Sequence, residues 1–264
     1  MNKGKLYLII LSIFVLSSIL AFDYAFAGIT LGGVLNLSND PGDSKLPTIF
    51  SAGSKVYVVW NNSTVNTVSF TNSTNDGVSF YNDVSLGSTN TGGTAATSPD
   101  PEVAANGDNV YVVWQDNNII KLRRSTNNAG TFLSEQSISS TANADATQDG
   151  VIRVNSTQNF VHVAWVDSSD RVRFSASNDN GATFGLKSEF DVGSISTTTN
   201  MDMAVSSGNV HIIRKASPDI FMRTSTDGGA NFGSDIDLGT TSGIGSGLDI
   251  DAIGSKVYAV WRVL

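Results

Sequence analysis

The side chains best suited to chemistry in this chain recur at one position of a short repeated segment. Each copy places a polar residue between two apolar or proline residues, which is the alternation of a strand with one buried face. The copies are Pro47-Thr48-Ile49, Pro101-Glu102-Val103, Ile152-Arg153-Val154, Met201-Asp202-Met203 and Leu248-Asp249-Ile250. Carboxylates and a guanidinium on equivalent strands could bind a sugar or a cation, or supply a glycosidase carboxylate pair. The alternative is that Arg153 is offset by Glu102 and Asp202 in an ion-paired channel lining.

A second repeated segment ends in tryptophan in four of its five copies. Runs of β-branched and aromatic residues bounded by turn residues predict strands. The copies are Val56-Tyr57-Val58-Val59-Trp60, Val110-Tyr111-Val112-Val113-Trp114, Val161-His162-Val163-Ala164-Trp165, Val210-His211-Ile212-Ile213-Arg214 and Val257-Tyr258-Ala259-Val260-Trp261. Arg214 replaces Trp in the fourth copy, and a departure from a local rule marks a candidate functional position. The candidate ligand-binding residues are therefore Glu102, Arg153, Asp202, Arg214 and Asp249.

A third repeated segment follows the pattern Ser-x-Asp/Asn-x-Gly-x-x-Phe, with Ala129 at the Gly position of the second copy. The Asp or Asn can accept main-chain amide bonds across a tight turn, the Gly supplies a positive φ, and the Phe returns to the core. The turn has too few carboxylates for a calcium loop. We therefore predict a structural role for Ser73, Asn75, Gly77, Phe80, Ser125, Asn127, Phe132, Ser177, Asp179, Gly181, Phe184, Ser225, Asp227, Gly229 and Phe232.

Together the three segments predict an all-β chain built from a unit of about 50 residues. Each unit has an inner strand A with the polar residue, a strand B ending in Trp, a strand C before the turn and a strand D after it. Four short antiparallel strands repeated around an axis form a β-propeller blade. Strands A and B occur five times and strands C and D four times. We expect about five blades, the last completed by the N-terminal strand at residues 29–37; the alternative is an open arc of a larger or truncated propeller.

The turn between strands C and D resembles the Asp-box, or bacterial neuraminidase repeat, of sialidase-like propellers. The resemblance covers nearly all of residues 28–264, and it implies that function lies at the face of the D–A and B–C loops, opposite the turns. It also implies a catalytic set of three arginines, a Tyr–Glu pair and an acid/base Asp. Here Lys45-Leu46-Pro47 stands where Arg-Ile-Pro is usual, and a Lys cannot replace a planar guanidinium. The catalytic residues, if there are any, are unknown.

Residues 1–27 have the pattern of a secretory signal peptide, with Lys3 and Lys5 before an apolar run and a cleavage site at Ala25-Phe26-Ala27. An uncleaved membrane anchor is the alternative, and residues 28–264 are the predicted propeller domain. The net charge of −8 argues against nucleic acid as a partner. With two His and no Cys, we expect no disulfide, no metal site and no cofactor.

These observations predict a secreted or cell-surface propeller that binds a glycan or an extracellular protein at its loop face without catalysis. The first alternative is an exo-sialidase or related glycoside hydrolase, which would need the three arginines and the Tyr–Glu pair to converge. The second alternative is a structural module of an envelope layer. A binding protein should show a polar ring or exposed aromatic side chains at the loop face.

Overall fold

The computed structural model describes residues 7–8, 11–13, 29–38, 42–89, 100–117, 119–139, 152–167, 169–185, 187–195, 201–240 and 247–262. The regular elements in these ranges are strands, and neighbouring strands pair antiparallel. Within the same ranges, no helix has the length and apolar character needed to cross a membrane. The chain is therefore all-β, as its alternating pattern predicts.

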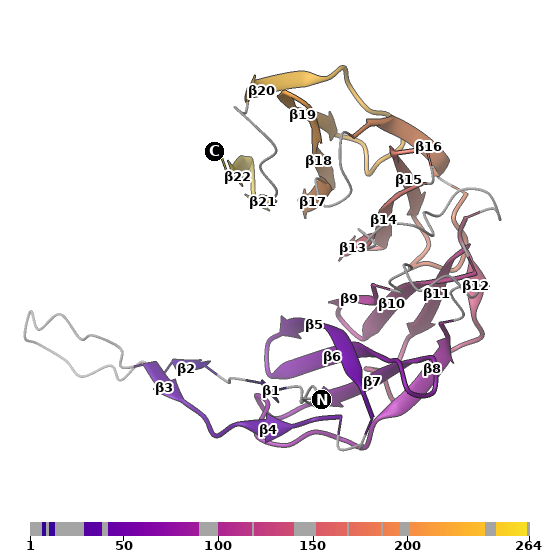
Figure 1. The fold of residues 1–264 in the computed structure, drawn as a ribbon, viewed down its shortest axis with the longest axis vertical. Helices are drawn as coiled ribbons and strands as arrows, with labels where there is room; N and C mark the ends of the chain where they lie inside the picture. Colours follow the sequence, from indigo (N-terminus) through magenta and orange to yellow (C-terminus); the bar gives the residue numbers. More distant parts are fainter. Residues whose placement is uncertain are drawn as a thin grey trace, which may run out of the picture.

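Four sheets of four strands follow one another along the chain, each running from an inner to an outer strand (Figure 1). The inner strands β5, β9, β13 and β17 surround an open centre. The strands are β5 (Ser44–Ala52), β6 (Lys55–Asn62), β7 (Thr67–Ser73) and β8 (Val84–Ser88); β9 (Glu102–Asn106), β10 (Asn109–Asp116), β11 (Ile119–Ser125) and β12 (Gln136–Ser137); β13 (Ile152–Thr157), β14 (Phe160–Val166), β15 (Arg171–Ser177) and β16 (Lys187–Ser194); β17 (Met201–Ser206), β18 (Asn209–Ala216), β19 (Asp219–Ser225) and β20 (Ile236–Thr240). Such sheets are propeller blades, so the predicted fold class is confirmed.

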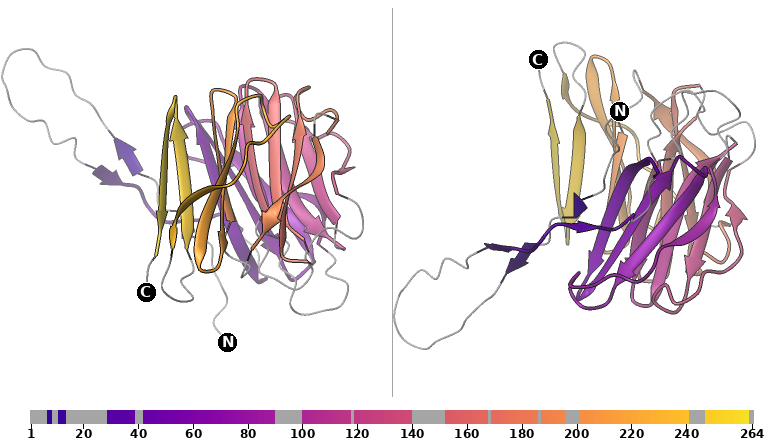
Figure 2. Two further views of the ribbon diagram at one scale, coloured as in Figure 1. Left: turned by 90° about the horizontal axis from the view of Figure 1, so that it is seen from above. Right: turned by 60° about the horizontal axis from the view of Figure 1, so that its bottom comes forward.

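The fifth sheet pairs β21 (Leu248–Ile253) with β22 (Lys256–Trp261), and the expected completion of this sheet by the N-terminal strand is not seen. Instead β3 (Ile29–Leu31) pairs with β2 (Leu11–Ile13), and β4 (Leu35–Asn36) pairs with β1 (Tyr7–Leu8). These local partners occupy the strand edges that closure would have used. The β2–β3 pair projects away from the blades (Figure 2). The sheets therefore form the open arc that was the alternative expectation, and Tyr258 and Val260 on β22 are 55% and 64% exposed.

Each blade packs on the next through alternate residues of its second strand. In β10, Val110, Val112 and Trp114 pack against the first sheet, whereas Val113 packs against the third. Trp114 is fully buried, and its Nε1 donates to the Ser88 carbonyl at 2.9 Å. Removing an aromatic side chain of this size from a core costs about 3–5 kcal/mol, so contact between blades explains why Trp recurs at this position of the repeat.

The A–B turns and the repeated C–D turns lie at the same end of the sheets, as strand order predicts. In each of the four blades the fourth residue of the C–D turn donates its amide to the A–B turn of its own blade. The bonds are Asp76 N to Ser54 O, Asn128 N to Asp108 O, Asn180 N to Asn159 O and Gly228 N to Gly208 O, at 2.8, 2.8, 2.8 and 2.9 Å. The inner strands begin at the opposite end, which places their first polar residues away from the repeated turns.

Candidate functional site

Glu102, Arg153 and Asp202 meet on the concave side of the arc. They lie at the start of three neighbouring inner strands, β9, β13 and β17 (Figure 1). Arg153 Nη1 lies 3.1 Å from Glu102 Oε1, and Arg153 Nε lies 2.8 Å from Asp202 Oδ1. The Arg153 side chain keeps 34% of its exposure, against 17% for Glu102 and 12% for Asp202. One guanidinium therefore bridges carboxylates of two adjacent blades while remaining partly open to solvent.

Burial governs the protonation of this cluster. Burial raises the pKa of Glu102 to about 8, although the charge of Arg153 opposes the shift. The pKa of Asp202 is also raised by burial and opposed by Arg153. Burial alone would lower the pKa of Arg153, but the two carboxylates outweigh it and raise that pKa. A carboxyl group that keeps its proton near neutral pH can donate a hydrogen bond as well as accept one.

Contacts to the main chain extend the cluster along the inner strands. Asp202 Oδ2 accepts a hydrogen bond from Ile250 N on β21 at 3.1 Å. Asp249, the neighbour of Ile250, is exposed and forms no ion pair with any residue in the described ranges. Asp202 therefore joins three blades, and Asp249 lies outside the cluster that its sequence position suggested.

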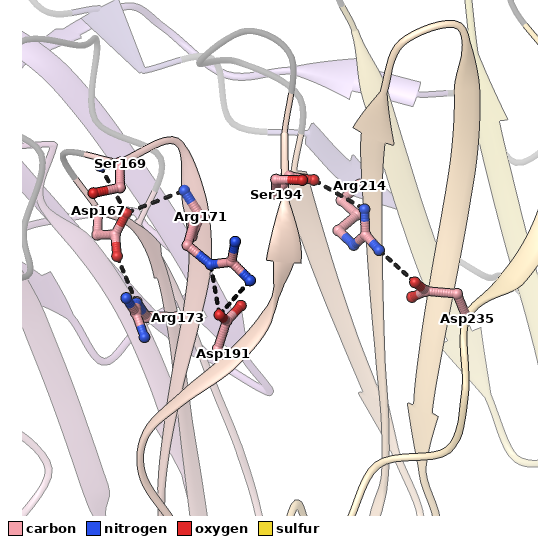
Figure 3. Close-up of polar contacts among 8 residues, drawn as sticks. All are labelled: Asp167, Ser169, Arg171, Arg173, Asp191, Ser194, Arg214 and Asp235. Atoms are coloured by element: carbon pink, nitrogen blue, oxygen red, sulfur yellow. Dashed lines mark hydrogen bonds and ion pairs between the residues drawn. The ribbon is translucent and has the colours of Figure 1, made fainter.

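Arg214 lies on β18 opposite Met201 of the inner strand β17, and its side chain extends to Ser194 and Asp235 at the junction of the third and fourth sheets (Figure 3). Its Nη1 donates to the Ser194 carbonyl at 2.9 Å, and its Nη2 lies 2.6 Å from Asp235 Oδ2. Its guanidinium carbon lies 5.0 Å from the centroid of the Phe221 ring, and the side chain is only 6% exposed. The structure thus brings together Glu102, Arg153 and Asp202 and gives Arg214 an inter-blade contact.

Three carboxylates that sequence analysis did not single out hold the outer arginines. Asp235 pairs with Arg223 at 2.8 Å as well as with Arg214. Asp167 Oδ2 lies 2.5 Å from Arg173 Nε, and Asp191 pairs with Arg171 (Figure 3). In the β15–β16 register Asp191 lies opposite Arg173 and pairs with Arg171, two residues away on the same strand, since opposite charges on neighbouring strands attract.

Asp167 also shapes the B–C loop of the third sheet. Its Oδ1 accepts hydrogen bonds from Ser169 N at 2.9 Å and from Arg171 N at 3.1 Å (Figure 3). The Asp167 side chain is 2% exposed. This loop lies at the end of the third sheet where β13 begins, which is also the end that carries Arg153.

The four repeated turns share one hydrogen-bond pattern. The Ser hydroxyl donates to Oδ1 of the Asp or Asn at 2.6–2.8 Å and accepts the amide four residues after it at 2.9–3.0 Å. The same Oδ1 also accepts a hydrogen bond from the main-chain amide of the residue four positions after the Asp or Asn, at 2.8–3.0 Å. The Ser177 hydroxyl and nearby amides lower the pKa of Asp179 to about 2, and the Asn231 amide and its neighbours do the same for Asp227.

The Phe of the second, third and fourth turns faces the preceding blade. Phe132 meets Phe70 edge-on with ring centroids 5.0 Å apart, and Phe232 meets Phe174 at 4.9 Å. Phe184 packs at the junction of the second and third sheets. The turns therefore fasten each blade to the one before it, in keeping with the structural role that their residue types indicate.

The arginines of the third and fourth sheets pair with carboxylates of their own or neighbouring sheets. The second and third strands carry four of them: Arg171 and Arg173 on β15, Arg214 on β18 and Arg223 on β19. Each pairs with Asp167, Asp191 or Asp235, whereas Arg153 pairs with Glu102 and Asp202. Burial raises the pKa of Tyr111 to about 12, which disfavours its use as a nucleophile. The described ranges contain no group of three or more His, Cys, Asp or Glu side chains placed to hold a metal ion.

Comparison with known proteins identifies the fold but no family. No family model matches the chain, and no curated protein matches it. The fucose-binding lectin of Aleuria aurantia, in a mutant bound to Fucα1-6GlcNAc, superposes with a TM-score of 0.53 at 11% identity, covering 82% of this chain and 71% of the lectin. A mutant of the NanB sialidase of Streptococcus pneumoniae superposes with a TM-score of 0.52 at 8% identity, covering 80% of this chain and 54% of the sialidase. The chain has a sialidase-like propeller fold, and it spans about half of that sialidase.

Proposed function

We propose that this chain is a non-catalytic, glycan-binding propeller whose site is the Glu102–Arg153–Asp202 cluster on the concave side of the arc. The observation that carries this proposal is the partly exposed Arg153 guanidinium held between two carboxylates of neighbouring blades. A rigid framework that presents a few convergent polar groups is the usual form of a small-molecule site.

The chemistry of the cluster suits hydroxyl groups better than it suits an ion. A guanidinium edge donates paired hydrogen bonds, and a carboxyl group with a raised pKa can donate or accept. Adjacent hydroxyls of a sugar ring are donors and acceptors at once, so they match both kinds of group. Because two guanidinium nitrogens of Arg153 already contact Glu102 and Asp202, an anionic ligand could not take their place without leaving these buried carboxyl groups unpaired. The ligand proposed is therefore a neutral sugar residue of a glycan.

The lectin that shares this fold binds a fucosylated disaccharide, and it supports the proposal as an analogy of fold. Binding without hydrolysis is favoured because both carboxylates are engaged by Arg153, whereas a glycosidase needs one of them free as base or nucleophile. We also propose that the protein is exported and cleaved near Ala27, a step that would remove β1 and β2 and release the edges of β3 and β4. N-terminal sequencing of secreted material would test it.

The second candidate function is that of a glycoside hydrolase, in particular an exo-sialidase, and one observation favours it. The pKa of Glu102 near 8 would keep a proton available for a leaving group, with Asp202 as the second carboxylate. A screen of aryl glycosides, including an aryl sialoside, with the wild type and Glu102→Gln separates the two functions. Turnover that Glu102→Gln abolishes would establish the hydrolase, and saturable binding without turnover supports the lectin-like function.

A further inference from the structure

A groove lies between the first and second repeated turns, at the end of the sheets opposite the Glu102–Arg153–Asp202 cluster. It encloses about 490 Å³, and its walls include Asn72, Tyr81 and Val84 of the first blade and residues 127–130 of the second turn. The Tyr81 side chain is 62% exposed. The volume suits a single extended side chain or a small ligand.

Asn72 is the buried polar group of this groove. It is only 8% exposed and lines the groove, and its side-chain amide forms no hydrogen bond with any residue in the described ranges. Its cross-strand neighbour Tyr57 also has a buried hydroxyl without a partner in those ranges. The Asn72 amide and the Tyr57 hydroxyl therefore leave capacity for hydrogen bonding unused at this junction.

The next junction along the arc shows what fills an equivalent groove. Arg124 stands one residue before Ser125, as Asn72 stands one residue before Ser73. Its Nη1 donates to the Asn180 carbonyl in the third turn at 3.2 Å. A guanidinium from the second blade therefore satisfies the main chain of the third turn.

Two more long side chains donate hydrogen bonds to main-chain carbonyls of a turn in the next blade. Gln136 on β12 occupies the register position of Val84 on β8, and its Nε2 donates to the Gly181 carbonyl at 3.2 Å. In the following junction, Lys187 Nζ donates to the Ala230 carbonyl at 2.9 Å. Main-chain carbonyls of the turns are thus met by cationic or amide donors from the preceding blade.

The groove lacks both donors, because Asn72 and Val84 replace the long side chains found in the second blade. No side chain in the described ranges donates to the carbonyls of Asn128, Ala129 or Gly130. The nearby Lys55 bonds instead to Asn128 Oδ1 and lies 3.5 Å from Asp108. The second turn therefore presents main-chain acceptors that its equivalents do not leave open.

We propose that this groove binds the guanidinium group of an arginine side chain supplied by another polypeptide. The guanidinium would donate to the carbonyls of the second turn, as Arg124 donates to the Asn180 carbonyl one blade later, and also to Asn72 Oδ1. Tyr81 would cover the bound cation by a cation–π contact, and the net charge of −8 favours a basic partner. This site is separate from the proposed glycan site and stands or falls independently of it.

The test uses Nα-acetyl-L-arginine amide as the probe and the full chain as the receptor, with binding followed by NMR titration or calorimetry. We expect saturable binding at one site per chain. Nα-acetyl-L-citrulline amide, the neutral isostere, should bind at least about tenfold more weakly, since a charged donor forms stronger hydrogen bonds to carbonyls than a neutral one. Asn72→Arg should fill the groove and abolish binding without lowering the melting temperature, and Tyr81→Ala should weaken binding several-fold.

Arg124→Asn provides a matched gain-of-site control, because it should open the equivalent groove in the next junction and raise the stoichiometry from one to two. Equal affinity for the arginine and citrulline probes would overturn the proposal, as would unchanged binding in both Asn72→Arg and Tyr81→Ala. Stronger binding of a neutral disaccharide than of the arginine probe at this groove would also overturn it.

Discussion

Arg214 donates to the Ser194 carbonyl at 2.9 Å, and Trp114 donates to the Ser88 carbonyl at the same distance. In both places a glycine lies against the donor: a Cβ on Gly193 would come within 2.7 Å of Arg214, and one on Gly87 within 2.5 Å of Trp114. At these two positions a flat side chain with an N–H donor bonds to the last strand of the preceding blade. Arg214 thus makes in the fourth blade the contact that Trp114 makes in the second.

Replacing Gly193 by Ala should destabilise the protein more than replacing Gly239 by Ala. The two glycines hold equivalent positions, with φ of 135° and 127°, but a Cβ on Gly239 meets nothing within 4 Å. The φ strain is shared, so the difference isolates the clash with Arg214. We expect Gly193→Ala to lose about 1–3 kcal/mol more free energy of unfolding, measured by urea denaturation. Equal losses would refute the inter-blade role assigned to Arg214.

Ala129→Gly should stabilise the protein. Ala129 has a φ of 64° at the turn position that Gly181 occupies with a φ of 72°. A side chain in this left-handed region costs about 1–2 kcal/mol, partly offset by the greater flexibility of unfolded Gly. The expected net gain of up to about 1 kcal/mol should appear as a higher melting temperature. Gly181→Ala is the reverse control, and a fall in melting temperature for Ala129→Gly would contradict the turn geometry.

Acid should weaken the third and fourth turns specifically. The pKa values of Asp179 and Asp227 lie near 2 in the folded chain, below the unfolded value of 3.8. Depressed carboxyl pKa values contribute stability above the unfolded pKa, and this contribution is lost as pH falls from about 4 to about 2. The double variant Asp179→Asn, Asp227→Asn should therefore flatten the melting temperature across that range.

The first and second turns supply an internal control for this experiment, because they already carry Asn75 and Asn127 and form the same bonds. The double variant should accordingly keep near-wild-type stability at pH 7. If its acid dependence between pH 4 and pH 2 matched that of the wild type, the turn carboxylates would not be the groups that titrate.

Glu102 should give stability the opposite dependence on pH. Its folded pKa near 8 lies above its ordinary value of 4.5. A raised pKa contributes stability that is full below the unfolded pKa and is lost as pH rises through the folded pKa. Glu102→Gln should therefore reduce the decline in stability between about pH 4.5 and pH 8, which thermal melts in a series of buffers would show. An identical decline in the wild type and the variant would mean that Glu102 is ionised throughout.

Much of the fold could be predicted because three different segments of the sequence recur in successive blades. The Trp segment, the inner-strand triplet and the Ser-x-Asp/Asn turn each recur with the same spacing, so strand order and the position of the turns follow from local pattern alone. Closure could not be predicted in this way. It depends on which edge pairs with residues 29–37, and the local partner Leu11–Ile13 takes the Ile29–Leu31 edge instead.

The candidate site was predictable in part for the same reason. Glu102, Arg153 and Asp202 share a repeat position on adjacent blades, so their proximity follows from the fold. Asp249 shares that position but lies on the fifth sheet, where it is exposed. Arg214 could not be placed from sequence, since its partners Ser194 and Asp235 are set by packing between blades.

The most direct test of the central claim is glycan binding by the wild type and by Arg153→Lys, compared on a glycan array and then by calorimetry. Arg153→Lys keeps the charge between Glu102 and Asp202 but removes the planar fork. We expect the wild type to bind at least one class of neutral glycan, and the variant to bind it about 10- to 100-fold more weakly with an unchanged melting temperature. Equal binding by the two proteins, or no glycan binding by the wild type, would contradict the account.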